Sequence, residues 1–286
     1  QRDVGRLLDC RRRTDVLPLG SGALAGVTYA TDREFLAREL GFGAASANSM
    51  DAVSDRDFVV EYQAAAAISM MHLSRLAEEL VLWSSREFAF LRLPDEFTTG
   101  SSMMPQKRNP DYAELARGKT GRVYGHLMGL LTVLKGLPLT YNRDLQEDKE
   151  GFFDTVDTLH STLEVFQGML AGLTLDVDRV SRLAGEGSAL ATDLADYLVG
   201  KGVPFREAHG ATRELCRYCE SQAKELPDLS LEEYRRFSPH FDQGVYRITV
   251  QTSVAARDTP GGTAPRRVKE ALEQAKRLLE ASGDGL

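Results

Sequence analysis

The segment most suited to chemistry is residues 100–110, which read Gly-Ser-Ser-Met-Met-Pro-Gln-Lys-Arg-Asn-Pro. One interpretation is a helix entry, with Asn109 as the N-cap and Pro110 at the first helical position. That interpretation leaves the two serines, Lys107 and Arg108 unexplained. Backbone amides, a helix terminus and two cations placed together favour an anion. We therefore predict that this segment binds a small-molecule carboxylate.

The same segment indicates a class of reaction. Lys107 and Asn109 can stabilise a carboxylate whose neighbouring carbon is losing a proton, because negative charge then flows onto the carboxylate oxygens. Ser101 is the candidate base, since amides, a helix dipole and a lysine can stabilise its alkoxide. Glu114 is either a surface carboxylate favoured by the helix dipole or a group that orients or charges a catalytic partner. The predicted chemistry is β-elimination next to a carboxylate.

Two more polar groups are candidates for substrate binding. Residues 141–150 begin with Tyr141 and contain Gln146 and Lys149, whose spacing puts both side chains on one face of a helix. The alternative is a solvated helix start, because acidic residues dominate this stretch. Arg56 precedes a long apolar segment, and it is either a cation for the substrate or the partner of an ion pair.

Composition excludes several classes of partner. A net charge of -7 and an isoelectric point near 5.4 argue against nucleic acid or an anionic membrane, which call for a basic face. The longest apolar patch, residues 64–71, is far shorter than the roughly 20 residues that cross a bilayer. Cys10, Cys216 and Cys219 are too few for a disulfide framework. We expect a cytoplasmic protein without a membrane or nucleic-acid partner.

Patterns that often signal a cofactor do not meet their requirements here. The glycines at 20, 22 and 26 have the wrong spacing for a dinucleotide loop. Cys216 and Cys219 have C-x-x-C spacing but lie in a predicted helix without a second pair. The five histidines are scattered without ligand spacing. We expect no metal and no organic cofactor.

The pattern of apolar residues predicts an all-α fold. Residues 54–90 contain neither proline nor glycine, and their apolar positions recur at steps of three and four, which predicts one long helix. Helices over 110–134 and 144–172 would complete an elongated bundle of long helices. We assign this bundle to a domain at 1–183. An isolated two-stranded coiled coil is the less favoured alternative, because further helices follow.

A smaller C-terminal helical domain is predicted at 184–286, after a Gly-Glu-Gly-Ser break. Two helices over 189–199 and 206–226 would form a helical hairpin around a Gly-Lys-Gly-Val-Pro turn. Residues 245–254 are rich in β-branched side chains and predict either a short strand or a poorly formed helix. A last amphipathic helix is expected to begin at Pro265.

Residues 100–110 resemble the G-S-S-x-M-P-x-K-x-N-P signature of the fumarase and aspartase superfamily, which is a highly specific motif. The glutamine at Gln106 resembles argininosuccinate lyases at this position, whereas fumarases and aspartases typically carry Gly there and adenylosuccinate lyases carry His. Further stretches that look like argininosuccinate lyases are residues 17–23, 48–51, 140–150 and 191–209. The resemblance covers nearly the whole chain.

The resemblance implies a reversible split of argininosuccinate into arginine and fumarate, without a metal or an organic cofactor. It also implies a homotetramer with a core of long helices and active sites shared between subunits. It makes Ser101 the catalytic serine, Lys107 the lysine that faces the developing aci-carboxylate, and Glu114 the carboxylate that raises the basicity of a catalytic histidine. The family assigns base and acid to serine and histidine in both ways, and we favour Ser101 as the base. The substrate-binding positions that the resemblance implies are Asn109, Tyr141, Gln146 and Lys149.

The sequence departs from the family in one respect. Argininosuccinate lyases carry an N-terminal half with the partner histidine in a Thr-His motif, and these 286 residues do not contain it. We therefore expect this chain alone to be inactive unless the missing half is supplied. The alternatives are another lyase of the superfamily, such as adenylosuccinate lyase, and a catalytically silent structural protein similar to delta-crystallin. Gln106 and Gln146 argue against the first. The intact set of Ser101, Lys107, Asn109 and Glu114 argues against the second.

Overall fold

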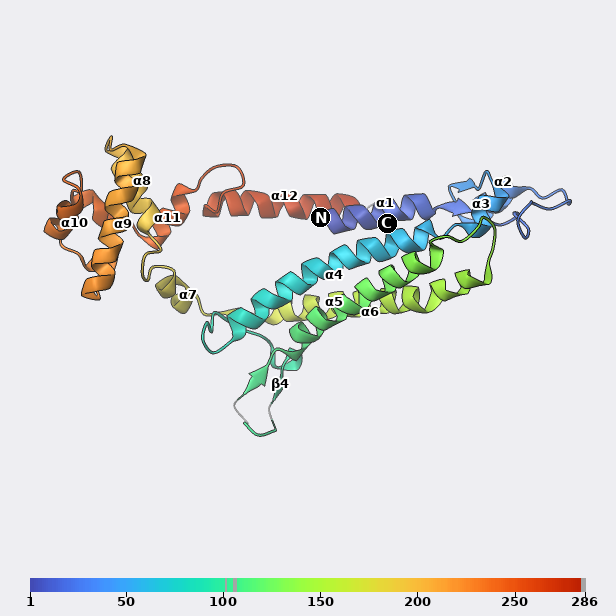
Figure 1. Ribbon diagram of the computed structural model, residues 1–286, viewed down its shortest axis with the longest axis horizontal. Coiled ribbons are helices and arrows are strands. Elements are labelled where there is room, and N and C mark those ends of the chain that lie inside the picture. Colours follow the sequence, from blue (N-terminus) through green and yellow to red (C-terminus); the bar gives the residue numbers. More distant parts are fainter. Residues whose placement is uncertain (101, 105–106, 284–286) are drawn as a thin grey trace. The chain divides into compact units, whose positions relative to one another are not determined.

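The longest helix, α4 (Asp57–Ser84), forms over a stretch that contains no helix-breaking residue. It is the axis of a helical bundle in the computed structural model of the chain, which describes residues 1–100, 102–104 and 107–283 (Figure 1). The chain forms two units, Gln1–Leu175 and Asp176–Leu286. The predicted division at 183/184 falls eight residues later along the chain and stays a prediction.

The first unit consists of a helical bundle with small strand pairs at its ends. Its helices are α1 (Arg2–Thr14), α2 (Arg33–Leu40), α3 (Ser49–Ser54), α4, α5 (Asp111–Leu134) and α6 (Asp148–Gly172), with the 3-10 turns η1 (Asp95–Phe97) and η2 (Arg143–Glu147). Its strands are β1 (Val16–Leu17), β2 (Ala44–Ala45), β3 (Leu91–Arg92), β4 (Thr99–Gly100), β5 (Arg108–Asn109) and β6 (Thr174–Leu175). The strands pair β1 with β2 in parallel, and β3 with β6 and β4 with β5 antiparallel.

Small side chains let the three long helices approach closely. Ala66, Ala77 and Ala113 are fully buried where α4, α5 and α6 meet. Larger side chains such as Met70 and Phe166 fill the space between these contacts. The prediction of an all-α fold built on a bundle of long helices is confirmed.

Both ends of the predicted 54–90 helix are wrong. Ser54 ends α3, and the N–H group of Asp57 at the start of α4 is bound by the Asp55 carboxylate at 2.7 Å. At the other end Ser85 is extended, and its hydroxyl donates to the carbonyl of Leu82 at 2.7 Å. Polar side chains that bind nearby backbone groups thus end a helix whose apolar pattern continues.

The second unit is a smaller helical domain. Its helices are α7 (Val177–Leu183), α8 (Ala191–Gly200), α9 (Phe205–Gln222), α10 (Leu231–Phe237), α11 (Val250–Ala256) and α12 (Pro265–Gly283), with the 3-10 turns η3 (Leu226–Asp228) and η4 (Gln243–Arg247). Helices α8 and α9 form the predicted hairpin, and α12 begins at Pro265 as predicted. Of the two structures considered for residues 245–254, the helical one is found, since η4 and α11 cover most of this stretch. Its core surrounds the fully buried side chains of Leu198, Leu215 and Phe241.

Among the residues that the structure describes, no helix combines the length and the apolar character that crossing a membrane requires.

Candidate active site

The signature segment is carried by a short hairpin at the start of α5. Thr99 pairs with Asn109 and Gly100 with Arg108, so β4 and β5 hold the two ends of the segment together (Figure 1). The predicted helix cap at Asn109 is therefore wrong by one position, because Asn109 is extended and Pro110 is the N-cap. A residue before proline disfavours the helical conformation, and this keeps Asn109 in the strand.

Three of the predicted site residues line one cavity. Lys107, Asn109 and Glu114 face a cavity of about 920 Å³ beside the N-terminus of α5. Lys107 and Glu114 are exposed, and Asn109 is half-buried. Glu114 belongs to the first turn of α5, where the positive end of the helix dipole favours a negative charge. The structure thus brings together a cation, an amide and a carboxylate at a helix terminus.

The cavity also contains charged residues that the sequence did not single out. Its described lining has four cations, Arg86, Arg92, Lys107 and Arg108, and three acids, Glu87, Asp95 and Glu114. Arg92 donates to Asp95 at 3.1 Å, and Arg108 lies 3.6 Å from the same carboxylate. The hydrogen bond from Arg92 and then the charge of Arg108 lower the pKa of Asp95. The surplus of positive charge suits an anionic guest.

Arg86 and Arg92 were missed because both lie in the stretch predicted to be helical or shortly after it. The stretch between Trp83 and the signature segment gave no clear signal for them, since it holds three acidic residues beside the two arginines. Since α4 ends at Ser84, both arginines follow the helix and reach the wall of the cavity.

Two glycines of α6 allow the segment before the hairpin to pack closely against this helix. A Cβ atom on Gly168 would overlap Phe97, and a Cβ on Gly172 would lie 2.6 Å from Pro94. Pro94 precedes η1 and Phe97 is its last residue, and η1 leads into β4. The Phe97 ring also meets the Tyr112 ring edge-on at 5.7 Å between centroids. Because these two positions of α6 are glycines, η1 can pack closely against α6 and hold the hairpin beside the start of α5.

Ser101 and Gln106 lie outside the described residues. The catalytic role predicted for Ser101 and the family assignment based on Gln106 therefore rest on the sequence. The neighbouring Ser102 and Lys107 are described, and both are exposed.

The second predicted group lies at the other end of α5. Tyr141 precedes η2, Gln146 is in η2, and Lys149 is in the first turn of α6. All three side chains are exposed. Because α5 has 24 residues, its length of about 36 Å separates this group from the signature hairpin (Figure 1). One chain therefore does not bring its two groups of predicted residues together.

Arg56 is found as an ion-pair partner, which was one of its two predicted roles. Its Nε donates to Oδ2 of Asp148, and its Nη1 donates to the carbonyl of Asp55 at 2.6 Å. Lys149 Nζ donates to the other oxygen of Asp148 at 2.9 Å. Asp148 was missed because it lies in an acidic stretch that also reads as a solvated helix start, yet its side chain is only 8% exposed.

The cysteine and glycine patterns considered for cofactor binding lie in the described part of the chain. No cluster of His, Cys, Asp or Glu suited to a metal is found among the described residues. Cys216 and Cys219 lie on α9 as free thiols. Gly20, Gly22 and Gly26 all have positive φ and lie in the loop between the two-residue strand β1 and the helix α2, so a short strand-loop-helix unit is present, but their spacing is not that of a dinucleotide loop.

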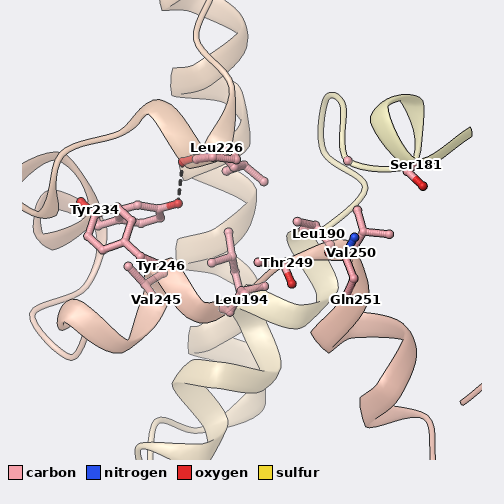
Figure 2. A pocket seen from close by; sticks show the side chains of 13 residues that line it. Ser181, Leu190, Leu194, Leu226, Tyr234, Val245, Tyr246, Thr249, Val250 and Gln251 are labelled. Atoms are coloured by element: carbon pink, nitrogen blue, oxygen red, sulfur yellow. Dashed lines mark hydrogen bonds between the residues drawn. The ribbon is translucent and has the colours of Figure 1, made fainter. Parts of the chain in front are cut away.

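The second unit has an apolar cavity of its own, of about 280 Å³ (Figure 2). Leu190, Leu194 and Val245 contribute to its walls, and the Tyr234 hydroxyl donates to the carbonyl of Leu226 at 2.6 Å. Burial raises the pKa of Tyr234. The cavity contains none of the predicted site residues, so the candidate active site lies in the first unit.

Comparison with protein families gives two matches. A family described as lyase matches residues 1–125, and the family described as argininosuccinate lyase C-terminal matches residues 188–255. The first match ends in α5 and contains the signature hairpin. The second covers α8 to α10 and most of α11.

Two similar curated proteins have the same name. The argininosuccinate lyase of Moorella thermoacetica is 59% identical over 286 residues, which are 100% of this chain and 62% of that protein. The argininosuccinate lyase of Dehalococcoides mccartyi is 57% identical over 283 residues, which are 99% of this chain and 61% of that protein. The chain therefore spans about three fifths of the length of these relatives.

Solved structures show the same fold. EDDS lyase in complex with formate has a TM-score of 0.89 at 26% identity, and the match covers 99% of this chain and 58% of that one. A class II fumarase from Schistosoma mansoni has a TM-score of 0.71 at 16% identity over 87% of this chain and 55% of that one, which shows the fold alone. With a signature hairpin at the start of α5, a C-terminal match and relatives of this identity, the chain belongs to the argininosuccinate lyase family of the fumarase and aspartase superfamily.

Proposed function

We propose that this chain supplies the signature part of an argininosuccinate lyase, which splits argininosuccinate reversibly into arginine and fumarate. The observation that carries the proposal is the single cavity that Lys107, Asn109 and Glu114 share beside the N-terminus of α5. The names of the curated relatives support the choice of substrate.

The proposed chemistry follows from the charges of this cavity. A base removes a proton from the carbon next to a carboxylate, and the negative charge moves onto the carboxylate oxygens, where Lys107 and Asn109 stabilise it. The carbon-nitrogen bond then breaks while an acid donates a proton to the departing guanidino nitrogen, which releases fumarate and arginine. We assign the base to Ser101 by family resemblance and the acid to the catalytic histidine of the family. Glu114 is proposed to raise the basicity of that histidine. That histidine belongs to the part of the family sequence that these residues do not include.

The two groups of site residues imply that the active site is shared. Tyr141, Gln146 and Lys149 are proposed to hold the substrate, but about 36 Å of helix separates them from Lys107 within one chain. A hairpin from one copy and a 141–149 segment from another would complete the site. We therefore propose a homotetramer in which several subunits contribute to each active site.

A stripe of glycines on α5 supports close packing of copies. Gly118, Gly121, Gly125 and Gly129 follow steps of three and four and so share one face of the helix. An added Cβ at each would meet no atom within 4 Å in the described chain. Met128, on the same helix, is 61% exposed. A helix surface with small and apolar residues suits another helix packed closely against it.

A cytoplasmic location is part of the proposal. Cys10, Cys216 and Cys219 are free thiols, which fits a reducing compartment. The elimination needs proton transfer and charge stabilisation by side chains, so the proposal includes no metal and no organic cofactor.

Complementation tests the proposed function. Fumarate formation from argininosuccinate is measured for the chain alone and after adding the part of the Moorella thermoacetica relative that this chain does not match. We expect little or no activity alone and clear activity after addition. Full activity of the chain alone would contradict the expectation of a missing half, and no activity in either case would favour a silent structural protein. Turnover of adenylosuccinate instead of argininosuccinate would point to the sister enzyme.

A further inference from the structure

The buried carboxylate of Asp148 contacts two cations at the start of α6. Arg56 Nε donates to Oδ2, and Lys149 Nζ donates to Oδ1 at 2.9 Å. The side chains of Arg56 and Asp148 are 14% and 8% exposed, whereas that of Lys149 is 59% exposed. One oxygen of Asp148 is therefore bound within the buried pair with Arg56, and the other binds the exposed ammonium group of Lys149.

The buried pair joins two segments that are far apart in the sequence. Arg56 is the N-cap residue of α4 and also donates to the carbonyl of Asp55 at 2.6 Å. Asp148 is the first residue of α6, 92 positions later. Charge-assisted hydrogen bonds of this kind have well-defined geometry, and the fork of an arginine adds directional preference. The ion pair between Arg56 and Asp148 thus joins the starts of α4 and α6 next to Lys149.

We propose that Asp148 is a positioning residue that holds the Lys149 ammonium group for the substrate, and that Arg56 acts through Asp148 rather than on the substrate. The inference rests on the proposed function, in which Lys149 is a substrate-binding residue. The three side chains carry a net charge of one positive unit, so an anionic group of the substrate is still attracted after Lys149 is held.

Two physical accounts of Asp148 predict opposite effects on substrate binding. If Asp148 only weakened the positive charge of Lys149, its removal would improve the binding of an anionic substrate and lower KM. If Asp148 positions Lys149, its removal frees a long flexible side chain, and binding becomes weaker. An interaction that is equal in the ground state and the transition state changes KM and leaves kcat nearly unchanged.

The first measurement does not depend on activity. The rate at which an amine-reactive acylating reagent modifies Lys149 is followed by peptide mass spectrometry in the 286-residue chain and in its Asp148→Asn variant. We expect Asp148→Asn to raise the rate by about two- to fivefold, the range expected for losing an exposed ion pair. Asp154→Asn is the matched control, because Asp154 lies on the same helix but pairs with Arg122 and His126. An unchanged rate at Lys149 in Asp148→Asn would overturn the proposal.

The second measurement uses the complemented assembly and argininosuccinate. We expect Asp148→Asn to raise KM by about five- to tenfold with kcat within about twofold, while Asp154→Asn changes neither. An unchanged or lowered KM would overturn the positioning role. Because Asp148→Asn leaves Arg56 buried without its partner, the double variant Arg56→Met/Asp148→Asn is measured as well. It removes both buried charges, and the proposal expects the same rise in KM in a stably folded protein.

Failure of the proposed function gives a different result. In that case neither the unmodified chain nor any variant turns over argininosuccinate after complementation, and the substrate role of Lys149 is overturned with it. The labelling rates still decide whether Asp148 holds Lys149.

Discussion

Glu233 shows how donors around one carboxylate set the response of the second unit to pH. Lys224 and the Tyr218 hydroxyl donate to its Oε1 at 2.6 and 2.8 Å, and the N–H group of Ser230 donates to Oε2 at 2.8 Å. The hydrogen bond from Lys224, followed by those from Ser230 and Tyr218, lowers the pKa of Glu233 from 4.5 to about 2. Because the pKa is lower in the folded state, the stabilisation is present above pH 4.5 and is lost as the pH falls toward about 2.

We expect Glu233→Gln to lower the Tm of the second unit at pH 7 and to lower it much less at pH 3. The amide cannot carry the charge that Lys224 stabilises, so the variant lacks the part of the stability that depends on pH. Thermal unfolding followed by circular dichroism between pH 3 and 7 measures the difference. Glu232→Gln is the control, since Glu232 is the exposed neighbour on the same helix turn. A Tm difference for Glu233→Gln that stays constant over this range would contradict the expectation.

Three predicted site residues that are neighbours in the chain also lie together in the structure. Lys107, Asn109 and Glu114 lie within eight positions, and the structure places them around one cavity. Sequence reasoning could not find the partner of Arg56, because Asp148 is 92 positions away and only packing of α6 against α4 brings the two together. The sequence alone therefore could not decide whether Arg56 is a cation for the substrate or the partner of an ion pair.

At the scale of elements, the close contact of α6 with η1 determines where the signature hairpin lies. A Cβ on Gly168 would overlap the Phe97 ring, which packs against Tyr112 at the start of α5. Alanine in a helix normally stabilises relative to glycine by roughly 0.5–1 kcal/mol. Here we expect the reverse, and Gly168→Ala should destabilise by about 1–3 kcal/mol because the ring has to move. Urea unfolding of the purified chain measures the free energy.

A second substitution separates this contact from a general helix effect. Gly210→Ala on α9 is the matched control, because an added Cβ there meets nothing within 4 Å, and it should stabilise slightly. Phe97→Leu should recover part of the loss in Gly168→Ala, because the smaller side chain leaves room for the methyl group. If Gly168→Ala proved as stabilising as Gly210→Ala, the close contact between Gly168 and the Phe97 ring would not constrain the position of η1.

The elements themselves were predictable where apolar periodicity extends over many turns. The helices predicted over 110–134 and 144–172 are found as α5 and α6 within a few residues. The ends were less predictable, because they depend on single side chains such as Ser85, whose hydroxyl binds the carbonyl of Leu82. The strand pairing of Asn109 with Thr99 was not predictable at all, since two-residue strands carry no alternation.

At the scale of the whole molecule, the proposed activity depends on assembly. The signature hairpin and the 141–149 segment lie at opposite ends of α5, so a separated copy contains both groups of site residues but keeps them apart (Figure 1). The glycine stripe on α5 gives a way to disturb assembly without disturbing the fold of one copy. Gly121 is exposed, and an added Cβ there meets no atom within 4 Å.

We expect Gly121→Leu to shift the assembly toward smaller species, raising the dissociation constant by roughly five- to 150-fold, because overpacking a close helix contact costs about 1–3 kcal/mol. Sedimentation velocity at micromolar concentration measures the species, and circular dichroism should show unchanged helix content. Gly210→Leu is the control, since Gly210 is equally free of contacts but lies on α9. Activity in the complemented assembly should fall with the fraction of large species, because the hairpin of one copy then no longer meets the 141–149 segment of another. If Gly121→Leu dissociated the assembly and each separated copy kept full activity, shared active sites would be excluded, and all site residues would have to act within one chain.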